Sequence, residues 1–368
     1  MIRVKPMNAV LLLVMMLGIF PVRAATEAGA AAITQGYDRE QRLWLSEMRL
    51  APDAQTLELI TKKRPNPADY GAKLKRLLNR ELANDWTLKY GAWLLKNDPS
   101  LKAESQRALL NAVEEHHMQS PKLGTFCIGM VYLNARGEMP RSGKLPLRSR
   151  GMKLLETIES SNPHTEVQGQ AALALSIMLG ELGDDYRIMA QRRKHLTEAI
   201  IKSAHVKLGG ITVADIVRDE LYKIKNLSKG RVAPSIRGTD AAGRAMQLKD
   251  FRGKVVMLVF WSSWDNEAAR SLGILRKIMS RKVADPFAIV GVNRDSLRNL
   301  RALEADRLVT WRNFSDPDQK IAKDYRVTGW PYCLVLGKDG VIHYRGAVGS
   351  FADAVASDLL HRKKNNTP

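Results

Sequence analysis

The chain has 368 residues, a length that predicts about two domains, and 45% of its residues are hydrophobic while 26% are charged. This composition excludes a disordered chain, and 26 glycines are far too few for a collagen-like one. The 58 Lys and Arg residues against 38 Asp and Glu give a formal net charge of +20, which favours acidic partners.

The basic residues are scattered through the chain. No dense run is longer than 192–194 or 362–364. Charge spread in this way is typical of a solvated surface and not of a dedicated nucleic-acid site. We therefore predict that the protein does not bind nucleic acid.

The first 24 residues have the pattern of a secretory signal peptide. Arg3 and Lys5 precede an apolar run at 9–20, and small residues follow at the cleavage positions around Ala24. The run of about 12 apolar residues is short of the ~20 that a membrane-spanning helix needs. We therefore predict export to the periplasm or cell envelope, cleavage of 1–24, and no membrane span after cleavage.

The chain has two cysteines, Cys127 and Cys333. An exported protein can form disulfides, but two distant cysteines exclude a disulfide framework. Neither lies near a second cysteine or a histidine cluster, so no metal site is expected. Buried free thiols are favoured over a bridge between the domains.

Residues 25–229 are predicted to form an all-helical domain. Its apolar residues recur at spacings of three and four. The predicted helices are 37–48, 69–82, 85–95, 101–116, 153–159, 166–182, 185–203 and 211–226. No clean repeat period appears, so a packed helical bundle is favoured over a helical-repeat surface. The stretch 137–150 is rich in Pro, Gly and basic residues, which predicts an exposed loop.

The histidines do not suggest a metal centre. His116 and His117 are adjacent and face different sides of a helix, whereas a metal clamp needs histidines four positions apart. We therefore expect a solvated helix end there. His195 and His205 show no shared site.

The pattern changes near residue 230, where strands begin to alternate with helices. The continuous apolar run at 254–261 predicts a buried strand. The remaining predictions are strands at 287–292, 332–336 and 341–345, and helices at 265–282, 296–303, 318–325 and 351–362. The Lys-Asp-Gly turn at 338–340 indicates a hairpin between the last two strands.

Five short motifs in this part of the chain resemble the thioredoxin-like family. They are APSIRGTD at 233–240, LKDFRGKVV at 248–256, FWSSW at 260–264, VTGWP at 327–331 and KDGVI at 338–342. They are most similar to exported TlpA-type thiol-disulfide oxidoreductases and to redoxins of the AhpC/TSA type. Over about 230–362 the resemblance implies a thioredoxin fold, a central mixed β-sheet flanked by helices, with 233–250 as an N-terminal β extension. It also implies a cis peptide between Trp330 and Pro331 beside the active-site turn.

The resemblance fails at the catalytic positions. The family has Cys-x-x-Cys after the aromatic residue that corresponds to Trp264, and this chain has Asp265, Asn266, Glu267 and Ala268 there. Dithiol exchange requires one thiolate to attack and a second thiol to resolve, so no disulfide can form at this turn. Asp and Asn are good helix N-caps, and negative charge suits a helix N-terminus. We interpret the four residues as structural caps of the next helix and not as an acid/base pair or metal ligands.

Cys333 is the remaining thiol in this region. It lies two residues after Pro331, so strand alternation puts both on one side, where a lone thiol could form a mixed disulfide. It also lies within the apolar run 332–336, with no basic partner in the sequence nearby. An inert core thiol is therefore favoured.

These observations predict an exported protein with a signal peptide at 1–24, a helical domain at 25–229 and a thioredoxin-like domain at 230–368. The leading function is non-catalytic binding or scaffolding in the cell envelope, with neither cofactor nor metal.

We expect Trp264, Trp330 and Pro331 to form a groove for an extended protein or peptide segment, and an acidic envelope component would fit the net charge. One alternative is a thiol-disulfide oxidoreductase or redoxin that acts through Cys333 or through a partner's thiols. A third class is a structural module in which the helical domain makes the interaction.

Overall fold

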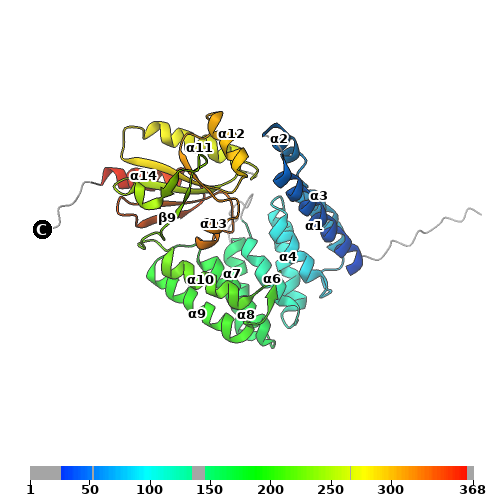
Figure 1. Cartoon of the computed structure of the whole chain (residues 1–368). Coiled ribbons are helices and arrows are strands. Elements are labelled where there is room, and N and C mark those ends of the chain that lie inside the picture. Colours follow the sequence, from blue (N-terminus) through cyan, green and yellow to red (C-terminus); the bar gives the residue numbers. More distant parts are fainter. Residues whose placement is uncertain (1–25, 52–53, 135–145, 266, 363–368) are drawn as a thin grey trace, which may run out of the picture.

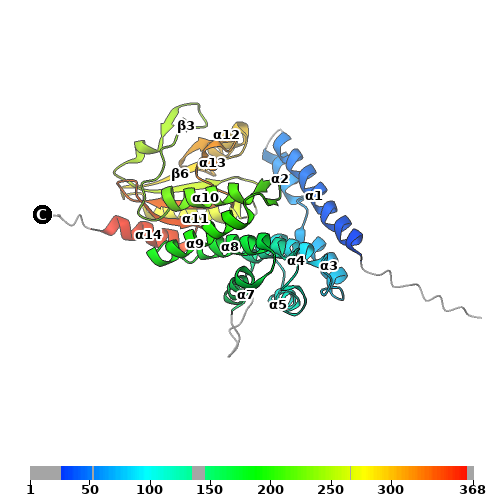
Figure 2. The same ribbon diagram turned by 90° about the horizontal axis from the view of Figure 1, so that it is seen from below.

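The computed structural model describes residues 26–51, 54–134, 146–265 and 267–362. They form a helical N-terminal region and a C-terminal region built around a five-stranded sheet, and α1 and α14 lie on opposite sides of the molecule (Figures 1 and 2). The predicted signal peptide lies outside the described residues, as does most of the predicted loop at 137–150. The end of that loop is helical, because α7 begins at Leu147.

The N-terminal region contains ten α-helices, two other helical turns and two short strands within its described residues. They are α1 (Glu27–Leu50), α2 (Ala54–Lys62), α3 (Pro67–Leu78), α4 (Thr87–Asn97), α5 (Ala103–Ala112), the π-helical turn η1 (Val113–His117), α6 (Leu123–Gly129), the 3-10 turn η2 (Met130–Tyr132), α7 (Leu147–Ser161), α8 (Thr165–Leu179), α9 (Tyr186–Ser203), β1 (Lys207–Leu208), β2 (Ile211–Thr212) and α10 (Val213–Asn226). Each predicted helix overlaps one of these.

Helices α2 and α6 and strands β1 and β2 of this region were not predicted from the sequence. Helices α2 and α6 are short, so their periodic patterns are weak. Strands β1 and β2 form a small antiparallel hairpin, which corrects the all-helical prediction. Gly209 and Gly210 make its turn with φ values of 62° and 100°, a backbone conformation that side chains with a Cβ atom rarely adopt.

Local hydrogen bonds determine where several helices begin. The Asp185 carboxylate accepts hydrogen bonds from the backbone N–H groups of Arg187 and Ile188 at the start of α9. Thr212 and Asp215 form a reciprocal capping box at the start of α10. Such caps satisfy N–H groups that have no partner within the helix.

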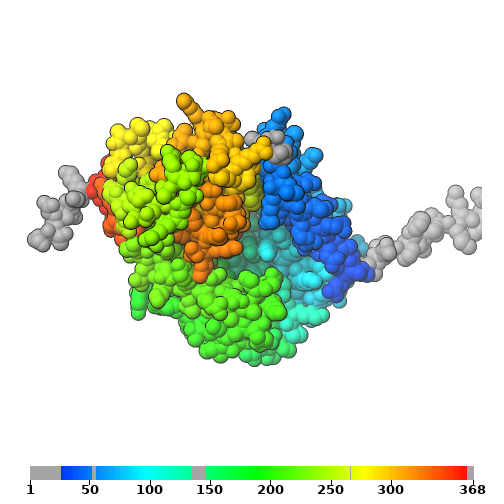
Figure 3. Space-filling model, in the orientation of Figure 1, coloured from blue at the N-terminus to red at the C-terminus, as the bar shows by residue number. Residues whose placement is uncertain are grey.

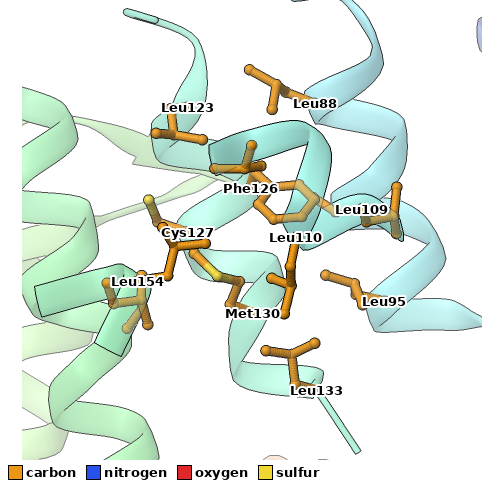
Figure 4. Close-up of a cluster of buried hydrophobic side chains, with 14 of the residues drawn as sticks. Leu88, Leu95, Leu109, Leu110, Leu123, Phe126, Cys127, Met130, Leu133 and Leu154 are labelled. Atoms are coloured by element: carbon orange, nitrogen blue, oxygen red, sulfur yellow. The ribbon is translucent and has the colours of Figure 1, made fainter. Parts of the chain in front are cut away.

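The core of the helical region is apolar and closely packed. Leu110, Phe126 and Met130 are among its fully buried side chains (Figure 4). Cys127 lies in the same cluster, is completely buried and forms no disulfide, and its burial raises the pKa of the thiol. The predicted buried free thiol is confirmed.

The C-terminal region contains the elements expected of a thioredoxin fold. They are β3 (Arg237–Thr239), β4 (Ala245–Gln247), the 3-10 turn η3 (Leu248–Phe251), β5 (Val255–Trp261), α11 (Ala268–Arg281), β6 (Phe287–Asn293), α12 (Leu297–Ala305), β7 (Arg312–Ser315), α13 (Lys320–Asp324), β8 (Tyr332–Leu336), β9 (Ile342–Gly346) and α14 (Ser350–His361). The sheet order is β7-β6-β5-β8-β9, in which β5, β6 and β7 are parallel and β8 and β9 are antiparallel to their neighbours. The predicted mixed sheet is confirmed.

The central strand β5 is buried on both faces, as its continuous apolar sequence predicts. Val256, Leu258 and Phe260 pack on the face that holds the 233–251 segment and the end of α10. The alternate residues of β5, ending at Trp261, pack on the face that carries α11 and α14. Strand β5 therefore ends between the two packed faces, and the turn that leads to α11 follows it directly.

A buried ionic network joins the two regions. Asp184, in the turn after α8, accepts hydrogen bonds from Arg345 of β9 at 2.8 Å and from the Lys229 backbone N–H at 3.0 Å. Arg192 of α9 is 1% exposed and pairs with Glu220 of α10 at 2.9 Å. Because buried charges are tolerated only when they are paired, this network favours one arrangement of the regions.

The described helices include none that is long and apolar enough to cross a membrane.

We predict that Glu220→Ala lowers the free energy of unfolding by about 3 to 5 kcal/mol, because it leaves Arg192 buried without its nearest partner. Urea denaturation followed by circular dichroism measures this. The matched control is Arg218→Ala on the same helix, whose 72% exposed side chain should change the value by about 0.5 kcal/mol or less. Equal effects of the two substitutions would contradict the prediction.

Candidate functional site

The turn between β5 and α11 is the position at which the resemblance places an active site. Two other segments reach it. Arg294 and Asp295 follow the neighbouring strand β6, and Trp330-Pro331 precedes β8. The Trp330-Pro331 peptide is cis, as the resemblance implied.

Asp265 stands where the resemblance places the first cysteine of the family motif, and it is held by two hydrogen bonds. Its carboxylate accepts one from the Ser262 hydroxyl at 2.6 Å and one from the Arg294 Nη2 at 2.6 Å. The Asp265 and Arg294 side chains are only 9% and 13% exposed. Asp265 is therefore the buried acceptor of an ion pair.

The predicted capping role of Asp265 is wrong. Helix α11 begins at Ala268, its N-cap residue is Glu267, and no side chain accepts a hydrogen bond there. The reason is competition, because the guanidinium and the Ser262 hydroxyl already occupy the Asp265 carboxylate. Asn266 lies outside the described residues, and Glu267 is exposed 3.5 Å from Arg270.

Arg294 stacks on both tryptophans of the motif. Its guanidinium carbon lies 4.1 Å from the centroid of the Trp264 ring and 4.1 Å from that of Trp330. Burial lowers the pKa of the guanidinium, and the charge of Asp265 opposes that shift. Cation–π contacts of this kind strengthen when water is excluded. Arg294, through its ion pair with Asp265 and its stacking on Trp264 and Trp330, thus links the turn after β5, the segment after β6 and the segment before β8.

Asp295 binds the backbone of the same turn. Its carboxylate accepts a hydrogen bond from the backbone N–H of Ser263 at 3.0 Å and one from the Asn293 side chain at 3.1 Å. Burial raises the pKa of the Asp295 carboxyl, while these hydrogen bonds act in the opposite direction.

Arg294 and Asp295 were not predicted as site residues from the sequence. A signal was present, because both follow a buried strand at the edge of the sheet where β5 ends.

An open groove of about 780 Å³ lies beside the site. It is lined by one face of α11, by Trp330 and Pro331, and by residues 347–350 with Asp353. The structure therefore brings two of the three predicted groove residues together. Trp264 does not line this groove and packs instead against Trp44 of α1.

Cys333 lies in the core of the sheet. It pairs with Val259 in the register of β8 against β5, and its Sγ lies 3.5 Å from the Ala347 carbonyl oxygen. The residue is fully buried and forms no disulfide, and burial raises the pKa of its thiol to about 12. The predicted buried thiol is confirmed.

The histidines form no common centre in the described part of the chain, where no group of three or more His, Cys, Asp and Glu residues could hold a metal ion. The solvated helix end predicted at 116–117 is wrong for His117, which is buried against Asp85 and the Leu82 carbonyl oxygen. The wider π-helical turn there shifts the faces expected from a regular helix. His195 and His205 pair with separate carboxylates.

We predict that Asp265→Ala destabilises the protein by about 2 to 4 kcal/mol, because Arg294 then remains largely buried without its anion. Urea denaturation measures the change. Glu267→Ala is the control, since its exposed ion pair contributes about 0.5 kcal/mol or less. If Asp265→Ala were as mild as the control, the ion pair would not be what holds this turn.

Comparison with known proteins finds similarity in the C-terminal region. The model of the AhpC/TSA family matches residues 229–345. A thioredoxin-like protein of Bacillus subtilis, YneN, is 27% identical over 141 residues, which are 37% of this chain and 82% of that protein. The thiol-disulfide oxidoreductase ResA of Bacillus cereus is 26% identical over 146 residues, which are 37% of this chain and 79% of ResA.

Among solved structures, the thioredoxin domain of a thiol-disulfide oxidoreductase from Bacteroides vulgatus is 25% identical. It aligns with a TM-score of 0.34 and covers 37% of this chain and 100% of that domain. The family match, the sheet order and the cis-proline segment coincide in one part of the chain. The C-terminal region of this protein therefore belongs to the thioredoxin-like superfamily, among the redoxins.

Proposed function

We propose that this protein is an exported binding or scaffold protein of the cell envelope whose thioredoxin-like region no longer performs thiol–disulfide exchange. The observation that carries the proposal is the ion pair between Asp265 and Arg294 at the position of the family's first cysteine. A carboxylate cannot form the mixed disulfide through which exchange proceeds. The signal-like pattern at 1–24 supports export.

The names of the relatives favour one alternative, a thiol-disulfide oxidoreductase or redoxin. In this chain it would act through Cys333 or through thiols that a partner supplies. The state of Cys333 counts against the first route, because a buried thiol with a pKa of about 12 is scarcely ionised at neutral pH.

The groove beside Trp330 and Pro331 supports peptide binding. It is open and has Trp330 and Pro331 in its lining, which suits an extended segment. Its lining includes three basic residues, Arg270, Lys277 and Arg281, and two acidic ones, Glu267 and Asp353, so its net charge is positive. Charge complementarity therefore favours an acidic peptide.

A reductase assay tests the loss of redox activity. We predict that residues 25–368 do not reduce insulin with dithiothreitol as the electron donor, whereas the Asp265→Cys/Ala268→Cys variant does. The new thiol at position 265 would lie beside Arg294, and a neighbouring cation stabilises a thiolate.

Turnover by the unmodified chain would refute the redox-inactive role. In that case the Cys333→Ser variant shows whether Cys333 is the source, since activity would then disappear with the thiol.

A binding assay tests the groove. We predict that the full chain binds a fluorescein-labelled extended peptide of about ten residues rich in Glu and Asp more tightly than the same peptide with Gln and Asn. Trp330→Ala should weaken binding about tenfold or more, since aromatic anchors dominate such contacts. Fluorescence anisotropy measures both.

Tyr186→Ala is the matched control, because Tyr186 is an 81% exposed aromatic residue on α9 and does not line the groove. If Trp330→Ala left the peptide affinity unchanged, the proposal that the peptide binds in this groove would be wrong.

A further inference from the structure

A hairpin of the helical region lies on the turn at Trp264. The end of α1 and the whole of α2 enclose a small apolar cluster in which Trp44, Met48 and Leu57 are 3%, 5% and 7% exposed. Trp264 joins this cluster from the C-terminal region. In the space-filling view the blue α1–α2 hairpin rests against the yellow and orange part of the chain (Figure 3).

The contact continues the stack that holds the site. The rings of Trp44 and Trp264 meet edge to face with centroids 6.3 Å apart. Arg64 stacks on Trp44 at 4.9 Å, and Arg294 stacks on Trp264 at 4.1 Å. A continuous series of cation–π and ring contacts therefore runs from Arg64 through Trp44, Trp264 and Arg294 to Trp330 and spans both regions.

The position of Trp44 is fixed by its own hairpin. Its indole Nε1 donates a hydrogen bond to the Ile60 carbonyl oxygen at 2.9 Å, which ties α1 to α2. Trp44 is therefore already held in position for its contact with Trp264, and little side-chain freedom is lost when the two rings meet.

We infer that the α1–α2 hairpin is the resident occupant of the aromatic surface beside the former catalytic position. It covers Trp264 and leaves the groove at Trp330 and Pro331 open, so it closes one end of the peptide-binding surface. A partner that uses Trp264 must first displace Trp44. The cover is a property of the chain itself and does not depend on which peptide binds.

The hairpin is attached in a way that allows such displacement. The first half of α1 packs into the main helical core through Ala30, whereas Trp44, Met48 and Leu57 belong to the separate small cluster. The outer side of the hairpin exposes Leu43, Leu50 and Leu59, which are 60%, 79% and 54% exposed. A segment with few buried contacts opens at lower free energy than the core.

Hydrogen exchange of the full chain, read by mass spectrometry, tests the cover. In Trp44→Ala we expect the backbone amides of 262–265 to exchange about tenfold faster or more, because the turn loses its cover. In Trp264→Ala the amides of 54–62 should exchange faster in the same way. The exposed neighbour Leu43→Ala should alter neither segment, and α8 should stay protected in all three variants.

Unchanged exchange of 262–265 in Trp44→Ala and of 54–62 in Trp264→Ala would overturn the inference. Trp44→Phe should restore most of the protection, since it keeps an aromatic edge. Where Trp44→Ala fails to fold, as loss of protection in α8 would show, the reciprocal measurement on Trp264→Ala decides the question.

The acidic peptide provides a second readout that rests on the proposed function. Displacing the hairpin should raise the affinity of Trp44→Ala for that peptide several-fold. If exchange responds as expected and neither variant binds the peptide, the cover stands and the peptide-binding proposal fails. The two outcomes are therefore distinguishable.

Discussion

The ion pair between Asp265 and Arg294 is the interaction on which the site depends. It connects the turn after β5 to the segment after β6, and the stacking of Arg294 on Trp330 adds the segment before β8. An active thioredoxin needs a thiol at this turn that is accessible and readily ionised. Here the same place holds a largely buried carboxylate whose partner is fixed between two aromatic rings. In this chain the turn is a structural joint.

The surrounding sheet fixes the positions of Asp265 and Arg294 relative to each other. Because β5 and β6 are parallel neighbours, the residues that follow them emerge at one edge, and Asp295 can hold the Ser263 backbone while Arg294 reaches Asp265. The buried Asp184 network holds the helical region against β9 at the same time. In both the Asp265–Arg294 pair and the Asp184 network, buried charges are paired. Burying them costs desolvation free energy, and the pairing specifies how the connected segments are oriented.

The sequence predicted the thioredoxin-like region well, because its strands are continuous apolar runs and its missing cysteines lie in a short motif. The predictions from the sequence were wrong or absent where a residue far away in the chain determines what a side chain binds. Asp265 has a strong capping propensity, yet Arg294 engages its carboxylate first. The pairing of Trp44 with Trp264 joins residues far apart in the chain, and no periodicity signals such a contact. Strand β7 was missed because three of its four residues are polar, among them Asn313, which is buried and accepts a hydrogen bond from the Trp261 indole.

The loss of the cysteines and the cover over Trp264 are physically compatible with each other. A thiol at position 265 would have to meet its substrate's sulfur directly, so exchange there would require the α1–α2 hairpin to open. An ion pair needs no access, and it becomes stronger as its neighbours exclude water. The contact between Trp44 and Trp264 therefore reinforces this turn and joins it to the helical region.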